Sequence, residues 1–541
     1  MNCISRLAYR SDNGLVYLSV LIKNNHPLLC IGLLKTISTP KVYRKTTGGA
    51  TVLCILQLFA PTRVVTLFLS THMRHCRGGQ FCHLVPARIL SVRIPGTFFA
   101  MYKNHLLKGA LLLTAAGVFS RIIGFFYRIF LSRTFGAEQM GIYELISPVL
   151  ALSFALCTSA IQSSISKFTA AEPEAAIYAK RRILLTGLSV SFVLSCLCTL
   201  FVWREADFIS DFLLKETRCA PLLKIAALSF PAACIHSCIN GYYYGIRKSF
   251  LPAFCQVFEQ CFRVGSVLLF GQYAAFCGLS CTIQLAAVGL VIGECASMVV
   301  SVFAARIHFS KKLPESLPLK LSRPELFSRL FSFAAPLCAT RVCLHLLGTI
   351  ESSRIPVSLQ LFGYSSHQAL SAYGVYTGMA MTCILFPGAL TNSIAVLLMP
   401  TISCADASNN QSAIYSAIFQ CTCFCLFIGV GCTAVFSLCG NFIGSALFGN
   451  VLAGQLIRMF CFLCPFLYLN TTLLSILNGL GKTGCTFLFQ ILSLAVRLFF
   501  VFFILPLSGI PGLFQGMLFG QMLLTILCAA ALFFVLSRRH A

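Results

Sequence analysis

The stretch GALLLTAAGVFSRIIGFFYRIFLSRTFGAEQMGIYELISP, from Gly109 to Pro148, decides the fold of this chain. Its first part is apolar and longer than the roughly 20 residues that a helix needs to cross a bilayer. Arg121 and Arg128 lie inside it, and their spacing of two helical turns puts them on one face. An arginine in a membrane span costs about 3 kcal/mol, so this face is expected to meet protein or water instead of lipid. The same face otherwise carries small residues, namely Ala110, Thr114, Gly117 and Gly124.

The composition indicates a polytopic membrane protein. Of the 541 residues, 57% are hydrophobic and only 10% are charged, and the mean hydropathy is +0.85. Soluble globular chains of this length do not have such a composition. The predicted fold class is therefore all-α, with a set of transmembrane helices that accounts for most of the chain.

Residues 1–100 differ from the rest of the chain. They hold 12 of the 41 lysines and arginines but a single acid, Asp12. Their apolar runs are interrupted by proline and arginine, and no signal peptide is recognisable. We interpret them as a basic extension that is either unstructured or lies upstream of the true start. Met101 is the start that we favour, because an ordinary membrane-protein N-terminus begins there.

About 12 spans are predicted after Met101. Between the sixth and the seventh, residues 306–325 form a basic, proline-containing segment that reads as a cytoplasmic linker. It separates an N-terminal lobe of six helices, residues 101–305, from a C-terminal lobe of six, residues 326–541. The predicted spans cover roughly residues 106–131, 141–166, 183–203, 221–244, 251–273, 283–305, 327–350, 369–398, 414–439, 456–478, 485–507 and 512–536.

The charges of the loops predict the orientation. If the end near Met101 is cytoplasmic, 17 lysines and arginines fall in inner loops and 7 in outer loops. This bias follows the positive-inside rule, and it places both ends of the core in the cytoplasm. The net charge of +26 is thus read as a signal of topology, and no nucleic-acid partner is expected.

The two halves carry similar patterns in the same order, which indicates a parallel internal repeat. Repeated halves are typical of transporters that move two lobes about a central site. The matched pairs are Ser120-Arg121 with Thr340-Arg341, Gly141-Ile142-Tyr143 with Gly374-Val375-Tyr376, and Gln256 and Arg263 with Gln490 and Arg497.

The opening stretch resembles the stage V sporulation protein B group of polysaccharide transporters, within the multidrug/oligosaccharidyl-lipid/polysaccharide flippase superfamily. The segment NGYYYGIRKSFLPAFCQVFEQCFRV, from Asn240 to Val264, is similar to the same group. The likeness begins near Met101, and it implies two six-helix lobes in a V in a bacterial plasma membrane. Lipid II flippases, which are relatives, carry functional arginines in the first helix. Arg121 matches their Ser-Arg-x-x-Gly-Phe motif, whereas Tyr127 stands where they have an arginine and Arg128 follows it.

Five arginines in predicted spans are candidates for the wall of a central cavity that binds substrate. A guanidinium group stays charged and offers a planar fork of donors that suits phosphate oxygens. Acids in neighbouring spans are expected to pair with these arginines, and structural pairing and ligand contact remain equally open. Glu259 is expected to orient Arg263 four residues away, and Glu294 to lie at a close helix contact. The candidates are Arg121, Arg128, Arg263, Arg341 and Arg497, with Glu144, Glu259 and Glu294 as their supporting acids.

These features favour a flippase that moves an undecaprenyl diphosphate-linked oligosaccharide or a peptidoglycan precursor by alternating access, with H⁺ or Na⁺ as a possible coupling ion. Two alternatives stay open: an ion-coupled exporter of small cationic drugs, which would need acids in the cavity, and a non-transporting scaffold for cell-wall assembly. We expect neither enzymatic activity nor a cofactor. The segment from Asn478 to Thr483 resembles the end of a P-loop, the phosphate-binding loop of ATPases. Ile476 occupies the position of that motif's first glycine, so ATP hydrolysis is not expected.

Overall fold

The computed structural model describes three short stretches near the N-terminus and most of the chain from His105 onward; the described residues are 4–11, 14–23, 26–28, 105–173, 176–278, 282–310, 323–408 and 411–537. The chain divides into two units, Met1–Arg93 and Ile94–Ala541. In the first unit, three antiparallel strands, β1 (Ile4–Ser11), β2 (Gly14–Lys23) and β3 (His26–Leu28), form one small sheet in the order β1-β2-β3. Strands therefore occur where an unstructured extension was predicted. The other residues of the extension lie outside the described part, and the start at Met101 stays a prediction.

The first lobe begins with α4 (His105–Phe154), a long helix that breaks at Gly136. The φ of Gly136 is 79°, a conformation that glycine adopts without strain. The π-helical turn η2 (Ala155–Ser159) and α5 (Ala160–Ala171) continue the second half of α4. The remaining elements of this lobe are α6 (Ile177–Arg204), α7 (Ala206–Phe208), η3 (Ile209–Leu214), η4 (Thr217–Cys219), α8 (Ala220–Ala227), α9 (Ser229–Gly245), α10 (Phe250–Phe276) and α11 (Gln284–Ser310).

The second lobe begins with α12 (Arg323–Leu361), after a gap in the described residues that covers most of the predicted linker. It packs against α4 and α5 of the first lobe. The elements that follow are α13 (Ser366–Gly374), η5 (Val375–Ala380), α14 (Met381–Leu385), α15 (Gly388–Ala407), α16 (Gln411–Ile443), η6 (Gly444–Phe448), α17 (Val451–Phe460), η7 (Cys461–Leu463), α18 (Cys464–Gly479), α19 (Thr483–Phe499), η8 (Phe500–Ile504), α20 (Leu505–Ser508) and α21 (Ile510–Ser537).

The helices confirm an all-α polytopic membrane unit. Nine helices of the described part are long and apolar enough to cross a membrane, and two bent pairs raise the number to as many as 11. One of the nine, Leu111–Ala171, has 61 residues, which as a helix is about 90 Å, or about three times the hydrocarbon core of a bilayer. Because the chain breaks at Gly136, this segment holds two spans, and the count then agrees with the 12 predicted from the sequence.

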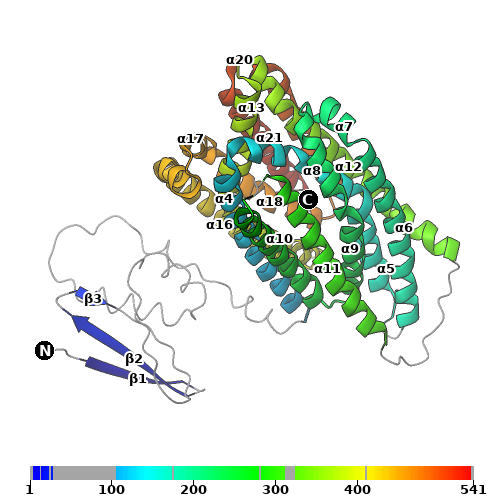
Figure 1. Ribbon diagram of the computed structural model, residues 1–541. Helices are drawn as coiled ribbons and strands as arrows, with labels where there is room; N and C mark the ends of the chain where they lie inside the picture. The colour runs from blue at the N-terminus through cyan, green and yellow to red at the C-terminus, as the bar shows by residue number, and fades with distance from the viewer. Residues whose placement is uncertain are drawn as a thin grey trace. The chain divides into compact units, whose positions relative to one another are not determined.

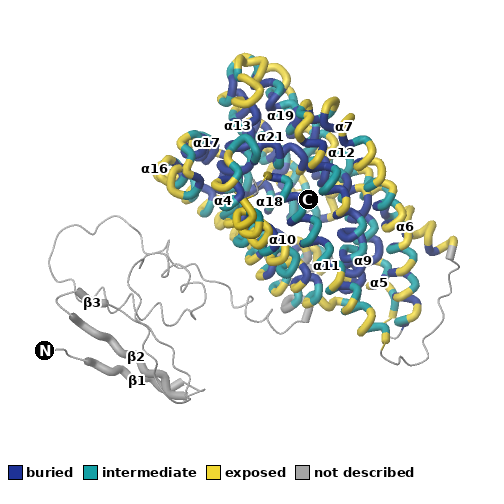
Figure 2. The backbone as a smooth tube through the Cα atoms, in the orientation of Figure 1, coloured by how far each residue is buried: buried dark blue, intermediate teal, exposed yellow. Residues whose placement is uncertain are grey.

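The arrangement of the helices separates two lobes (Figure 1). The helices α5, α6 and α9 lie on one side of the membrane unit, α16 and α17 lie on the other, and α4 and α10 lie between them. Buried residues follow the inward faces of the helices, and exposed residues follow the outer faces (Figure 2). Many of the exposed residues are large and apolar, as expected for a surface in contact with lipid.

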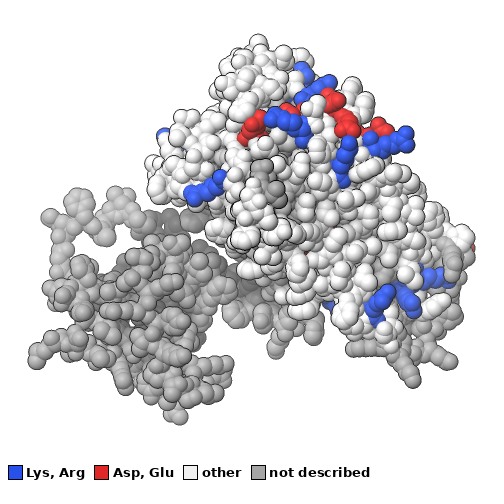
Figure 3. All heavy atoms as spheres, viewed as in Figure 1, with Lys and Arg blue, Asp and Glu red and all other residues white. Residues whose placement is uncertain are grey.

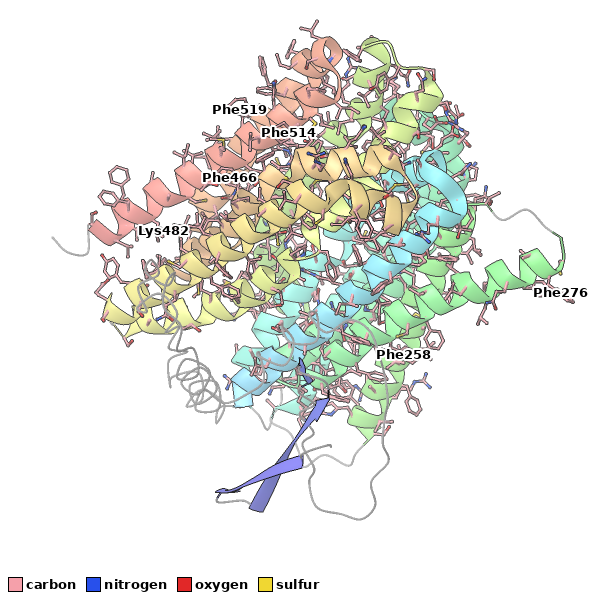
Figure 4. All side chains as sticks on the ribbon, turned by 90° about the vertical axis from the view of Figure 1, so that its left-hand side faces the viewer. Phe258, Phe276, Phe466, Lys482, Phe514 and Phe519 are labelled. Carbon is pink, nitrogen blue, oxygen red and sulfur yellow. The ribbon has the colours of Figure 1, made fainter. Side chains whose placement is uncertain are left out.

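The helix α10 shows this division between faces clearly. Its phenylalanines at every fourth position, Phe250, Phe254, Phe258 and Phe262, stack in a row along one side. Figure 4 shows α10 beside α4, with Phe276, which is 90% exposed, at its projecting end. The opposite side of α10 carries the polar residues that enter the site described below.

Two glycines allow the backbones of the two lobes to approach each other closely. A Cβ atom on Gly374 would lie 2.1 Å from the carbonyl oxygen of Ala137, and one on Gly141 would lie 2.3 Å from that of Leu370. Gly141 and Gly374 are the residues that the internal repeat matches with each other. The repeat-related helices therefore meet backbone to backbone at equivalent positions, which is the arrangement of two lobes about a shared axis.

Charged side chains gather at two ends of the membrane unit, with a broad uncharged band between them (Figure 3). Both signs occur at one end in this view. Among the described residues, Glu138 pairs with Arg218 at 2.7 Å and Asp207 pairs with Lys224 at 2.8 Å. Basic side chains predominate at the other end in this view. This is the pattern that the positive-inside rule leads one to expect, and the cytoplasmic placement of both ends of the core stays a prediction.

Candidate functional site

A cavity of about 590 Å³ lies between the two lobes. The first lobe contributes α4 and α10 to its wall, and the second lobe contributes η5, α14, α15 and α18. The lining residues are Ser120, Arg121, Gly124, Phe125, Tyr127, Arg128, Leu131, Tyr143, Gln256, Gln260, Arg263, Thr377, Thr382, Leu385, Phe386, Gly388, Thr391, Asn392, Leu467, Tyr468 and Thr471. Three of the five predicted arginines are therefore on this wall.

Arg121 and Arg128 reach the cavity from the small-residue face of α4. Gly124, between them, also lines the cavity, so the face predicted from the spacing of these residues is the one that avoids lipid. Arg121 is exposed to the cavity, and no carboxylate in the described residues forms an ion pair with it. Its guanidinium group is thus available to a ligand.

Arg128 links the two lobes. Its Nη1 lies 3.0 Å from Glu144 Oε1, on the second half of α4, and donates a hydrogen bond of 3.0 Å to Thr382 Oγ1, on α14. Glu144 is buried, with 7% of its surface exposed. Pairing of Arg128 with Glu144, one of the roles considered from the sequence, is therefore present, and the same arginine still borders the cavity.

Arg263 is held by two carboxylates behind the wall. Its Nη2 lies 2.6 Å from Glu259 Oε1, one helical turn away, and 3.4 Å from Glu294 Oε1 on α11. The in-helix pair with Glu259 agrees with the predicted spacing. Glu294 follows Gly293, where an added Cβ atom would lie 2.9 Å from the Glu259 carbonyl oxygen, so α10 and α11 are in close contact here as expected. His236 Nε2 on α9 completes the group at 2.7 Å from Glu294 Oε2.

The other two predicted arginines are not on this wall. Arg497 on α19 forms two charge-assisted hydrogen bonds with Glu351 on α12, Nε to Oε1 at 2.8 Å and Nη2 to Oε2 at 2.6 Å. Arg341 on α12 is partly buried, with His345 as a near neighbour on the same helix. Neither arginine lines the cavity that Arg121 borders in this conformation, and their contact with substrate stays a prediction.

Several residues of the site had no signal in the sequence. Thr382 is a threonine in an apolar span, and only the contact between the lobes brings it to Arg128. Tyr127 is 6% exposed, and its hydroxyl has no hydrogen-bond partner in the described residues. Gln256 and Gln260 of α10 also line the cavity.

The charge of the wall is positive. Among the described residues that line the cavity there are three arginines and no aspartate or glutamate. Glu144, Glu259 and Glu294 lie behind the arginines and orient them. In a protein environment an anion 4 Å from one guanidinium gains about 4 kcal/mol of Coulomb energy, so this wall is suited to an anionic ligand with several acceptor oxygens.

Two comparisons with curated proteins of Bacillus subtilis (strain 168) span most of the chain. Stage V sporulation protein B is 26% identical over 435 residues, which are 80% of this chain and 84% of that protein. Lipid II flippase MurJ is 22% identical over 470 residues, which are 81% of this chain and 83% of that protein.

Solved structures share the fold. A lipid II flippase MurJ in an inward closed conformation has a TM-score of 0.61 at 14% identity, with 78% of this chain and 87% of that chain covered. An inward-facing multidrug resistance MATE family transporter has a TM-score of 0.59 at 16% identity, with 80% and 99% covered. The family model described as "Polysaccharide biosynthesis protein" matches residues 106–406, which is more than half of the chain and includes Arg121 and Arg128. This multi-pass membrane protein belongs to the polysaccharide biosynthesis protein family, with the two-lobed fold of MurJ and the MATE transporters.

Proposed function

We propose that the protein is a flippase that moves the diphosphate-linked head group of a prenyl-anchored glycan or peptidoglycan precursor across the membrane. The head group enters the cavity between the lobes while the prenyl chain stays in lipid. Alternating opening of the lobes would then expose the head group to either side. The proposed process is polysaccharide, cell-wall or spore-cortex biosynthesis, in keeping with the family and the sporulation relative.

One observation carries the proposal: Arg121, Arg128 and Arg263 line a cavity whose described wall contains no carboxylate. A diphosphate offers several negatively charged oxygens, and arginine binds such oxygens through paired N–H donors. Thr382, Asn392 and Gln260 add hydroxyl and amide groups that suit the hydroxyls of a sugar. The volume of about 590 Å³ is within the range of small-ligand sites.

Two other functions are less well supported. An exporter of cationic drugs would place carboxylates on the wall, and the acids near this cavity are instead paired with its arginines. The MATE likeness is one of fold, at 16% identity, and it does not change this electrostatic argument. A scaffold that transports nothing would have no need for arginines at a cavity, and it would tolerate their replacement.

Reconstitution into vesicles tests the proposal. A fluorescent undecaprenyl diphosphate-linked sugar is placed in both leaflets, and its accessibility to a membrane-impermeant quencher is followed over time. The full chain should accelerate equilibration between leaflets, and Arg121→Gln should slow it. Arg458→Gln is the matched control, because Arg458 donates to the Ser437 carbonyl at 3.0 Å and does not line the cavity. Equal rates for protein-containing and empty vesicles would refute the proposal.

A further inference from the structure

A group of four buried or half-buried ionisable side chains extends inward from Arg263 on the cavity wall. It joins three helices: His236 comes from α9, Glu259 and Arg263 from α10, and Glu294 from α11. His236 and Glu294 are only 9% and 7% exposed. Glu294 is shared, since Oε2 lies 2.7 Å from His236 Nε2 and Oε1 lies 3.4 Å from Arg263 Nη2. The group thus connects a buried histidine to an arginine of the cavity.

The charge of this group depends on one proton. Two carboxylates and one guanidinium leave a net charge of −1 when His236 is neutral, and no net charge when it is protonated. An uncompensated buried charge is costly, and the second ring nitrogen, Nδ1, is buried without a partner in the described structure. With Nε2 facing Glu294, Nδ1 is the atom at which the charge state of the ring can change.

A proton fits this group better than a metal ion does. Ligand atoms of His236, Glu259 and Glu294 lie within 4.8 Å of one another. However, Arg263 Nη2 lies 2.6 Å from Glu259 Oε1 and occupies the side on which both carboxylates converge. A metal ion bound there would meet a guanidinium cation at close range. A proton compensates the same negative charge without displacing Arg263.

We propose that the His236–Glu294 pair is a proton-binding site that sets how firmly Glu259 and Glu294 hold Arg263, and thereby controls the affinity of the cavity for an anion. The inference rests on the proposed function, because it assigns Arg263 to the bound diphosphate. With the proton absent, Glu294 attracts Arg263 and holds its guanidinium group against the two carboxylates. With the proton present, His236 compensates Glu294, and the guanidinium is free to turn to the ligand.

The coupling works in both directions. A diphosphate near Arg263 draws that cation away from the carboxylates, and the remaining negative charge favours uptake of a proton. The other titratable groups that act on the four residues are Tyr127 and Tyr143 of α4 and Cys234 of α9. On other helices packed against α9, Lys167 lies over the ring of Phe333 and Lys224 pairs with Asp207, and the charges of α6 are at its ends. Protonation of the His236–Glu294 pair is therefore the titration that changes the net charge of this group.

Calorimetry of the purified full chain in detergent tests the proposal, with farnesyl diphosphate as the probe. Binding should strengthen as the pH falls from about 8 to about 6, by up to about tenfold per pH unit for one linked proton. Titrations in buffers with different ionisation enthalpies should show that about one proton is taken up per probe bound. Protonation of the probe itself would weaken binding at low pH, so it cannot produce this trend.

Two substitutions should fix the group in opposite states. His236→Gln keeps a donor for Glu294 but cannot take the proton, so it should bind weakly over the whole pH range. Glu294→Gln removes one of the two holds on Arg263, so it should bind tightly over the whole range. His308→Gln is the matched control on α11, because His308 faces the Tyr242 hydroxyl at 3.1 Å instead of this group, and it should keep the wild-type pH dependence.

The outcomes separate this inference from the proposed function. Binding without proton uptake in the wild type, or an unchanged pH dependence in both His236→Gln and Glu294→Gln, would overturn the inference and leave the flippase proposal intact. A wild type that does not bind farnesyl diphosphate at any pH would overturn both. The calorimetric proton count on the unmodified chain decides the question even where a variant fails to fold.

Discussion

Replacing Arg128 by alanine is expected to impair both the stability and the activity of the protein, and a second substitution should separate the two effects. Arg128 Nη1 lies 3.0 Å from Glu144 Oε1, and Glu144 is 7% exposed. Removing the arginine leaves a buried carboxylate unpaired, which costs about 3–5 kcal/mol. The free energy of unfolding of a folded protein is itself only about 5–15 kcal/mol. The single variant should therefore unfold at a clearly lower temperature.

The double variant Arg128→Met, Glu144→Gln removes both charges and keeps similar side-chain volumes. Replacing a buried ion pair by uncharged groups is often close to neutral, so thermal unfolding in detergent should return near that of the wild type. Transport should not return, because a charge-assisted hydrogen bond to phosphate contributes about 1.5–3 kcal/mol, or roughly 10- to 150-fold in affinity.

The assay is the leaflet-equilibration rate in vesicles, measured beside the unfolding temperature of the same preparation. Arg128→Lys is the third member of the series, and it should recover part of the rate, since a point charge lacks the planar fork of arginine. A double variant that transports at the wild-type rate would show that Arg128 serves only to neutralise Glu144. A double variant that stays as unstable as Arg128→Ala would show that the ion pair is not the source of the lost stability.

Three further predictions concern the lobes, the start and the topology. Gly374→Ala should hinder the contact between the lobes, because the added Cβ would lie 2.1 Å from the Ala137 carbonyl oxygen; crosslinking of cysteines introduced on either side of the contact should become slower. A chain that begins at Met101 should insert and equilibrate the lipid as the full chain does, which vesicles containing each form will show. Residues 306–325 and the C-terminal residues 537–541 should both label from the cytoplasmic side, and labelling from opposite sides would contradict the arrangement of six plus six spans.

Local patterns in the sequence predicted the parts of the site that depend on one helix. The two-turn spacing of Arg121 and Arg128 placed both on one face of α4, and the cavity borders that face. The one-turn spacing of Glu259 and Arg263 predicted their ion pair, which is 2.6 Å long. Helical periodicity is a short-range property, so it could be read without knowing how the helices pack.

Contacts between helices could not be predicted in the same way. Thr382, the partner of Arg128 across the lobes, looked like any threonine in an apolar span. His236, which was not singled out, gains its importance from Glu294, 58 residues later in the chain. Such features arise from tertiary packing, and a single sequence carries little information about it.

The internal repeat explains why Arg497 was predicted to border the cavity, although it does not line the cavity in this conformation. A repeat fixes equivalent positions for Arg263 and Arg497 within their lobes, but each arginine then pairs with whichever acid its neighbours supply. For Arg497 that acid is Glu351, bound through two hydrogen bonds, whereas Arg263 keeps its place on the cavity wall. All the arginines among the described residues of the cavity wall thus belong to the first lobe. The second lobe adds hydroxyl and amide groups such as those of Thr382 and Asn392. An anion bound there would be held mainly by the first lobe, so the second lobe could separate from it without breaking the strongest contacts.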